Sequence, residues 1–233
     1  MKGPAGFIIA ASLGLILALL IYLLVQVDHE TRPLWVLTGK LADRGNTLVY
    51  LPAGIEAGKR YPLVFALSPT ADAMTMLTTW AAVAEKHTWI IAASKTFQNG
   101  QDFGPSLQAV IAELDDVEGA YPVDPGRVIF AGLSGGGMGA HAVAKFYPDR
   151  VSAIVVNTGM AADGSLTPDY TSGKLAVFLA SPTDFRYTEM QGDRAFLAAH
   201  AWKTTWIEFP GGHRLAPASA YEQAAEWLEV NLP

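Results

Sequence analysis

The 233-residue sequence predicts an α/β protein, with a mostly parallel sheet covered by helices on both faces and one N-terminal transmembrane helix before it. Three observations lead to this prediction. Apolar strand-like segments alternate with helix-like segments, 21 consecutive residues near the N-terminus carry no charge, and a Gly-x-Ser-x-Gly motif lies where a strand should pass into a helix. Strands that are apolar throughout are typical of a parallel sheet buried on both faces.

The first 30 residues are predicted to be a membrane anchor, and residues 31–233 a single folded domain. Phe7–Val27 is long enough to cross about 30 Å of hydrocarbon. Lys2 precedes this stretch and Asp28 and Glu30 follow it, so the folded domain is expected on the periplasmic or extracellular side. A cleaved signal peptide is the alternative, but the apolar region is longer than a usual signal core and has no clear small-x-small cleavage site near its end.

Composition excludes several classes of protein and site. The chain has no cysteine, which excludes disulfides, cysteine-ligated metals and a lipid-attached cysteine. Its net charge is −6 and it has no run of Lys or Arg, so neither a nucleic acid nor a strongly anionic lipid surface is an expected partner.

Alternating elements can be placed along the chain by their apolar runs and turn residues. The first two strands are joined directly by a turn at residues 42–45, which favours an antiparallel edge. The expected strands are Leu34–Leu41, Asn46–Leu51, Tyr61–Leu67, Thr88–Ala93, Val128–Ala131, Val151–Val156, Leu175–Ala180 and Thr204–Phe209. The expected helices lie near Ala73–His87, Phe103–Ala120, Gly137–Phe146, Met190–Ala201 and Pro217–Val230.

The motif Gly132-Leu133-Ser134-Gly135-Gly136 lies between an expected strand and an expected helix. In that setting the serine occupies a sharp, strained turn with its hydroxyl exposed, and the helix N-terminus favours developing negative charge. A glycine-rich phosphate or dinucleotide site is the rival interpretation. It is disfavoured because a dinucleotide fingerprint normally follows the first strand of its domain and because neither Gly-x-Gly-x-x-Gly nor a P-loop is present.

A serine nucleophile needs a base within hydrogen-bond reach and a group that orients the base. His213 follows the last expected strand in a Pro-Gly-Gly-His segment and is the predicted base, with a solvated loop histidine as the alternative. Asp184 follows the strand Leu175–Ala180 and is the predicted acid, although it could be a turn or N-cap residue instead. Three other aspartates compete with it but do not directly follow a strong strand: Asp163, Asp169 and Asp193.

Two backbone N–H groups are expected to bind the developing oxyanion. One belongs to Gly135, the residue after the serine. The other should come from the loop Ser68-Pro69-Thr70-Ala71, where Pro69 has no N–H and Thr70 is the preferred donor ahead of Ala71. The loop Phe97–Phe103 follows the fourth expected strand and is the best sequence-based prediction for a substrate-facing segment, although a solvated linker is an equal alternative.

Residues 46–230 resemble the polyhydroxybutyrate-depolymerase and feruloyl/acetyl-xylan-type esterase branch of the α/β-hydrolases. The resemblance rests on Gly-Leu-Ser-Gly-Gly-Gly-Met-Gly-Ala-His with its closing Tyr-Pro-Asp-Arg, and on Tyr-Pro-Leu-Val, Val-Asp-Pro-Gly-Arg-Val and Pro-Gly-Gly-His. It implies an α/β-hydrolase fold and a serine esterase, and with the predicted anchor the chain is expected to be a membrane-anchored enzyme, unlike the freely secreted polymer-degrading relatives. Such an enzyme cleaves an ester of a small molecule or an acylated substrate through a Ser-His-Asp triad and an acyl-enzyme, with no metal or cofactor.

The chain departs from this branch at one position. Members usually carry His-Gly after the third strand, where this chain has Ser68-Pro69. The departure puts the oxyanion site in question and leaves a non-catalytic binding protein as an alternative. Thioesterase, depolymerase and peptidase activities also remain open. The short segment between Val156 and Leu175 leaves no room for a large lid.

Overall fold

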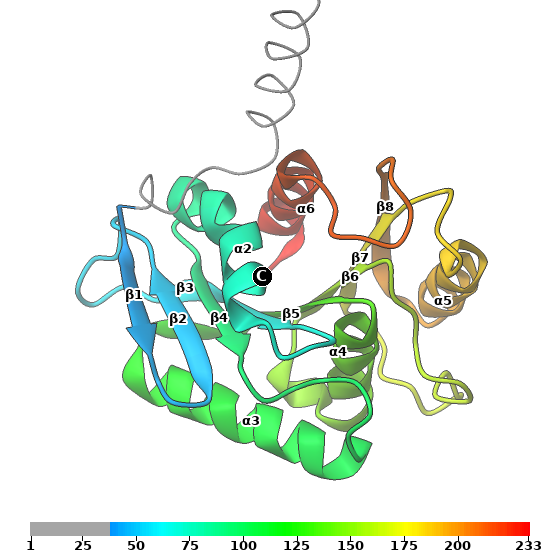
Figure 1. Ribbon diagram of the computed structural model, residues 1–233, viewed down its shortest axis with the longest axis horizontal. Helices are drawn as coiled ribbons and strands as arrows, with labels where there is room; N and C mark the ends of the chain where they lie inside the picture. The colour runs from blue at the N-terminus through cyan, green and yellow to red at the C-terminus, as the bar shows by residue number, and fades with distance from the viewer. Residues whose placement is uncertain (1–37) are drawn as a thin grey trace, which may run out of the picture. The chain divides into compact units, whose positions relative to one another are not determined.

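A single eight-stranded sheet lies at the centre of the part of the chain that the computed structural model describes, residues 38–233 (Figure 1). The order across the sheet is β1-β2-β4-β3-β5-β6-β7-β8. The strands are β1 (Lys40–Asp43), β2 (Thr47–Leu51), β3 (Tyr61–Leu67), β4 (Ile90–Ser94), β5 (Val123–Leu133), β6 (Ala153–Asn157), β7 (Leu175–Ala180) and β8 (Lys203–Glu208).

The sheet has the predicted directions. From β4 to β8 every neighbouring pair is parallel, whereas β1 pairs antiparallel with β2 and β2 antiparallel with β4. The antiparallel edge is therefore confirmed, but its first strand ends at Asp43, beyond the predicted end at Leu41, and the turn lies at residues 44–46. The predicted strand residues 34–37 lie outside the described residues.

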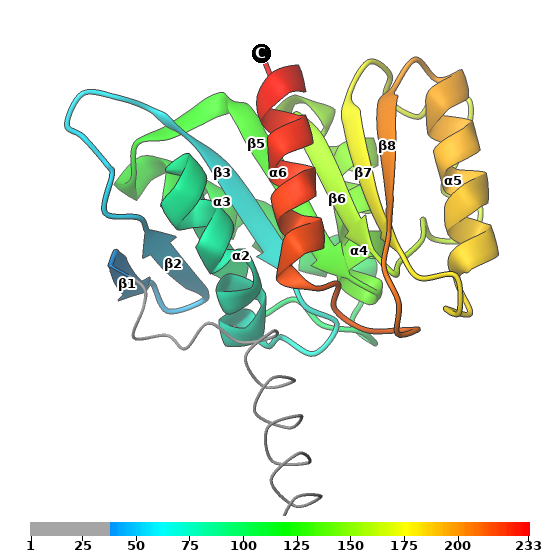
Figure 2. The same ribbon diagram turned by 90° about the horizontal axis from the view of Figure 1, so that it is seen from above.

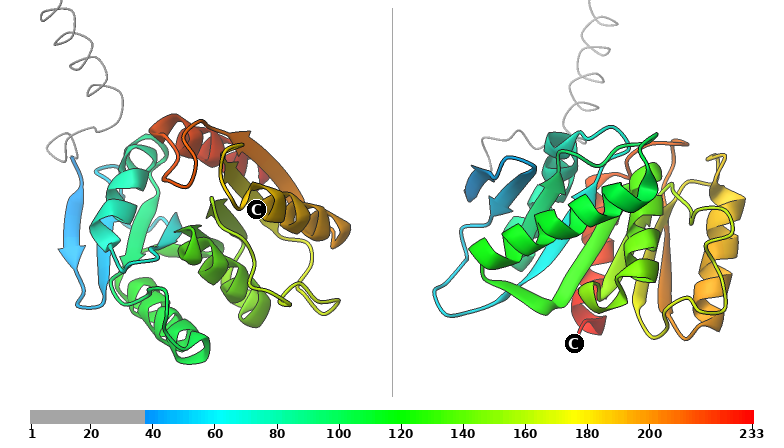
Figure 3. Two further views of the ribbon diagram at one scale, coloured as in Figure 1. Left: turned by 45° about the vertical axis from the view of Figure 1, so that its right-hand side comes forward. Right: turned by 90° about the horizontal axis from the view of Figure 1, so that it is seen from below.

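Helices cover both faces of the sheet, as predicted. In Figure 2, α2 (Ala73–His87) and α6 (Ala218–Asn231) lie over one face, and the right-hand view of Figure 3 shows α3 (Phe103–Ala120) and α4 (Gly135–Phe146), both green, over the other. The helix α5 (Tyr187–Ala199) packs beside β7 and β8 in the same core as α3 and α4, and the short 3-10 helix η2 spans Pro148–Arg150. The continuously apolar strands form because their side chains enter two separate cores, one on each face.

The main error of the strand predictions concerns β5. The prediction began at Val128, because Asp124-Pro125-Gly126 is typical of a loop. In the structure β5 begins at Val123, which pairs with Tyr61, and the register shifts before pairing resumes at Val128 with Leu63. A bulge therefore accommodates the proline inside the strand.

No helix among residues 38–233 is long and apolar enough to cross a membrane. The predicted transmembrane helix, Phe7–Val27, lies outside the described residues.

A buried polar cluster joins α4, α5 and the segment after β6. Tyr170 donates its hydroxyl to the carbonyl of His141 at 2.9 Å, and its oxygen lies 3.2 Å from His141 Nδ1. Asp193 Oδ2 accepts the Ala161 N–H at 2.6 Å and lies 3.8 Å from His141 Nε2. Burial lowers the pKa of His141 to about 3 and raises the pKa of Asp193 to about 6. His141 is therefore a packed helix residue, as predicted.

The raised pKa of Asp193 predicts a pH-dependent stability difference between the parent and Asp193→Asn, whose amide oxygen still accepts the Ala161 N–H. Between the unfolded pKa of 3.8 and the folded value of about 6, the folded parent binds more protons than the unfolded chain. The parent is therefore destabilised relative to the variant as pH rises, by up to about 3 kcal/mol above pH 6. Urea unfolding at pH 4–8 measures this difference, and a difference that does not change with pH would contradict the assignment.

Candidate active site

The turn at Ser134 connects β5 to α4 and holds the serine in an unusual backbone conformation. Its φ is 53° and its ψ is −116°, a left-handed φ that costs a non-glycine residue about 1–3 kcal/mol. A Cβ at Gly132 would lie 2.0 Å from the carbonyl carbon of Gly136, and a Cβ at Gly136 would lie 2.0 Å from the carbonyl oxygen of Leu67. The two outer glycines of the motif are therefore required by close backbone packing around the serine.

Three of the predicted site residues form a continuous series of contacts. His213 Nε2 lies 2.8 Å from Ser134 Oγ, and His213 Nδ1 lies 2.7 Å from Asp184 Oδ2. A carboxylate can only accept, so we assign the proton of the neutral ring to Nδ1, which donates to Asp184. His213 Nε2 is then left to accept the hydroxyl hydrogen of Ser134. This is the arrangement that general-base activation of a serine requires.

Asp184 is fixed from several directions just after β7. Its side chain has no exposed area, and its Oδ1 accepts the backbone N–H of Arg186 at 2.6 Å. The competing aspartates lie elsewhere: Asp163 and Asp169 are exposed, and Asp193 belongs to the buried cluster under the segment after β6. Of the four aspartates considered, the structure therefore brings only Asp184 to the imidazole.

The loop that carries His213 follows β8 and is held by contacts with residues that follow β7. Gly211 and Gly212 have φ values of +120° and +75°, which glycine adopts at little cost. The Gly212 N–H donates to the buried hydroxyl of Ser181 at 2.9 Å. The ring of Phe185, although 65% exposed, lies with its centroid 4.5 Å from that of the imidazole. These contacts restrict the loop and the imidazole ring.

Asn157, at the end of β6, connects the serine turn to the histidine loop. Its carbonyl accepts the Ser134 N–H at 2.9 Å. Its side-chain amide donates to the carbonyl of Arg214 at 3.0 Å, and its Oδ1 accepts from the Ala216 N–H at 2.8 Å and from the Tyr221 hydroxyl at 2.6 Å. One buried side chain and its backbone therefore set the distance between two segments that are far apart in sequence.

The two predicted oxyanion donors differ in their surroundings. Gly135 is the first residue of α4, so its N–H stands at a helix N-terminus directly beside Ser134. The Thr70 N–H donates to Ser68 Oγ at 3.2 Å, and the two hydroxyls of this loop lie 3.2 Å apart. Thr70 therefore has a partner within its own loop, unlike the free donor that the prediction assumed.

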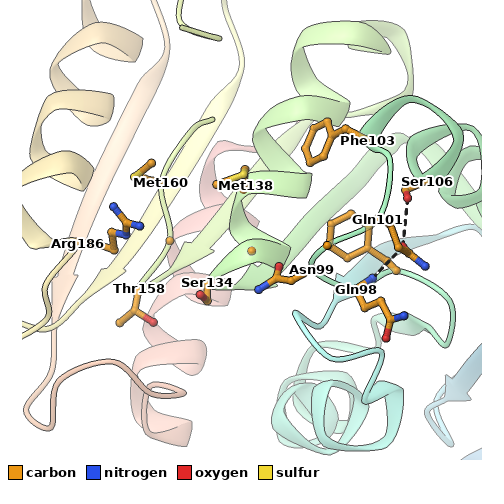
Figure 4. Close-up of a pocket in the computed structure, with 14 residues that line it drawn as sticks. Gln98, Asn99, Gln101, Phe103, Ser106, Ser134, Met138, Thr158, Met160 and Arg186 are labelled. Atoms are coloured by element: carbon orange, nitrogen blue, oxygen red, sulfur yellow. Dashed lines mark hydrogen bonds between the residues drawn. The ribbon is translucent and has the colours of Figure 1, made fainter. Parts of the chain in front are cut away.

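A cavity of about 330 Å³ opens beside Ser134 (Figure 4). Most residues of the predicted substrate-facing loop line it, whereas Asp102 instead caps α3. The opposite wall was not predicted from the sequence; it is formed by the segment after β6 and by Arg186. The lining residues are Phe97, Gln98, Asn99, Gly100, Gln101, Phe103, Ser106, Ser134, Gly135, Met138, Thr158, Gly159, Met160 and Arg186.

No protein-family model and no curated protein matches the chain. Solved structures do match. A thermostable esterase is 20% identical with a TM-score of 0.62 over 82% of this chain and 62% of its own. The acylaminoacyl peptidase of Pyrococcus horikoshii is 13% identical with a TM-score of 0.64 over 83% of this chain and 42% of its own. The carboxylesterase of Bacillus cereus is 18% identical with a TM-score of 0.62 over 80% of this chain and 95% of its own.

The chain has the α/β-hydrolase fold. It spans less than two thirds of the length of the first two of these structures. The α/β-hydrolase fold explains why the contacts above form: Ser134, Asp184 and His213 follow β5, β7 and β8, and parallel strands bring their carboxyl ends to one edge of the sheet.

Proposed function

We propose that the chain is a serine hydrolase that cleaves carboxylic esters through an acyl-enzyme on Ser134. One observation carries the proposal: the unbroken series of contacts from Ser134 Oγ through the imidazole of His213 to the carboxylate of Asp184, at 2.8 and 2.7 Å. The similarity in fold to an esterase and a carboxylesterase supports it.

The proposed reaction begins when Ser134 Oγ bonds to the ester carbonyl carbon. The hydroxyl proton passes to His213 Nε2, and the carbonyl electron pair moves onto oxygen, beside the Gly135 N–H. When the C=O bond re-forms, the C–O bond to the alcohol breaks and His213 returns the proton to the departing oxygen. A water molecule then repeats the sequence in place of the alcohol and releases the acid.

Asp184 stabilises the imidazolium that forms during each step. Its negative charge is buried beside Nδ1, where a low local dielectric strengthens the attraction. Its hydrogen bond from the Arg186 backbone holds the carboxylate in place, so the imidazole is kept with Nε2 directed at Ser134.

The cavity indicates a small ester with an apolar portion. Its volume of about 330 Å³ is at the lower end of the range for small-molecule sites, and its apolar lining comes from Phe97, Phe103, Met138 and Met160. Arg186 is the one charged side chain among the described residues that line it. A thioester or the end group of a polyester is attacked by the same chemistry and remains a second choice of substrate.

A fluorophosphonate probe tests the proposal. We expect the full-length protein to be labelled, because the probe reacts with an activated serine, and we expect Ser134→Ala and His213→Ala to lose labelling. Thermal melting shows whether each variant is folded. A folded parent that is not labelled would contradict the proposal and favour a non-catalytic binding protein, the alternative raised by Ser68-Pro69 and the engaged Thr70 N–H.

We also propose that Phe7–Val27 anchors the chain in a membrane, with residues 31–233 on the periplasmic or extracellular side. The proposal rests on the uncharged stretch and the flanking charges alone. Because the chain has no cysteine, Gln223→Cys on the exposed side of α6 gives a single reporter. We expect a membrane-impermeant maleimide to label it in intact spheroplasts and the membrane fraction to retain it; labelling only after lysis would contradict the orientation.

A further inference from the structure

In the loop after β3 the preferred oxyanion donor, the Thr70 N–H, already has a partner. Pro69 has no N–H, and the Thr70 N–H donates to Ser68 Oγ within the loop. Gly135 is then the one donor of the predicted pair with its N–H directly beside the reacting serine. A tetrahedral oxyanion held by a single hydrogen bond forgoes a large part of the stabilisation such a site can supply.

The side chain of Asn99 lies in the space next to this donor. A Cβ at Gly135 would lie 1.8 Å from Asn99 Oδ1 and 3.1 Å from Asn99 Nδ2, so the carboxamide lies directly against the first residue of α4. Figure 4 shows the amide nitrogen of Asn99 pointing toward Ser134. Because residue 135 is a glycine, there is room for the Asn99 carboxamide beside it. The amide N–H of Asn99 therefore faces the Ser134 hydroxyl from the cavity wall.

The loop that carries Asn99 is anchored to the oxyanion loop. The Asn99 N–H donates to the Pro69 carbonyl at 2.9 Å, and Gln98 forms an isolated β-bridge with Thr70. The side-chain oxygen of Gln101 accepts the Gln98 N–H at 3.2 Å, and the side-chain nitrogen of Gln101 donates to the carbonyl of Thr96 at 3.0 Å. The dashed hydrogen bonds of Figure 4 include the first of these. The Asn99 backbone is therefore held in place before any substrate binds, as an electrostatic donor requires.

We propose that Asn99 is a catalytic residue that binds the oxyanion through Nδ2–H, together with the Gly135 N–H. This inference rests on the proposed function. As the Ser134 Oγ–carbon bond forms, the carbonyl electron pair moves to oxygen, and the two N–H groups donate to it. Asn99 keeps its proton, and both hydrogen bonds weaken again when the C=O bond re-forms. The backbone N–H of Ala71 is the alternative second donor, and substitutions at Asn99 leave it unchanged.

Ester hydrolysis by Asn99→Ala tests the assignment. We expect kcat to fall by about 10²–10³-fold, the loss typical of removing one oxyanion donor, with little change in KM. The affinity for a boronic acid or trifluoromethyl ketone, which present a tetrahedral oxyanion, should fall as well. Asn99→Asp, which replaces the donor with a like charge, should be at least as impaired. Gln223→Ala, at an exposed position on α6 that does not line the cavity, is the control and should keep the kcat of the parent.

A double-substitution cycle separates a direct role from a disturbed loop. The methyl group of Gly135→Ala would occupy the position of the Asn99 carboxamide, so Gly135→Ala should lower kcat in the parent and lower it less in the Asn99→Ala background. Asn99 is exposed, so its variants should have the same melting temperature as the parent. An Asn99→Ala enzyme within about twofold of the parent in kcat would overturn the proposal and leave the Ala71 N–H as the alternative second donor. A folded parent with no hydrolysis would overturn the proposed function as well.

Discussion

The hydrogen bonds of Asn157 hold the candidate site together. Ser134 and His213 are 79 residues apart: Ser134 lies in the tight turn between β5 and α4, and His213 lies in the loop after β8. Asn157 ends a fully buried strand between them, and it binds the serine turn through its carbonyl and the residues after His213 through its amide. Because the Ala216 N–H and the Tyr221 hydroxyl are buried, losing the amide would leave these donors unsatisfied as well as release the histidine loop.

This anchoring allows the protein to keep a strained serine. The left-handed backbone at Ser134 is unfavourable in isolation, but the turn is enclosed by β3 on one side and β6 on the other, with glycines at each close approach. The same packing directs the hydroxyl outward and places the start of α4 beside it. The site therefore depends on the central strands, whose side chains are buried in the cores on both faces of the sheet.

The alternation of apolar strands with helices could be predicted because each strand is long, apolar and bounded by turn residues. Ser134, Asp184 and His213 could be selected because residues at the carboxyl ends of parallel strands meet at one edge. Asn157 and Ser181 could not, because a polar residue after a strand is ordinarily a turn residue and only the folded contacts show its partners. The hydrogen bond from the Thr70 N–H to Ser68 Oγ and the cavity wall formed by Thr158–Met160 likewise depend on how loops pack. The anchor at Phe7–Val27 stays a prediction from sequence.

Intact-mass spectrometry tests most directly whether Ser134 is the nucleophile, with the full-length protein rapidly mixed with p-nitrophenyl acetate and quenched in acid. We expect a species heavier by one acetyl group, with the group located by peptide mapping on Ser134, together with a burst of p-nitrophenol that is absent in Ser134→Ala. Hydrolysis without a trapped acetyl group at Ser134, or with the group on another residue, would show that this serine is not the nucleophile.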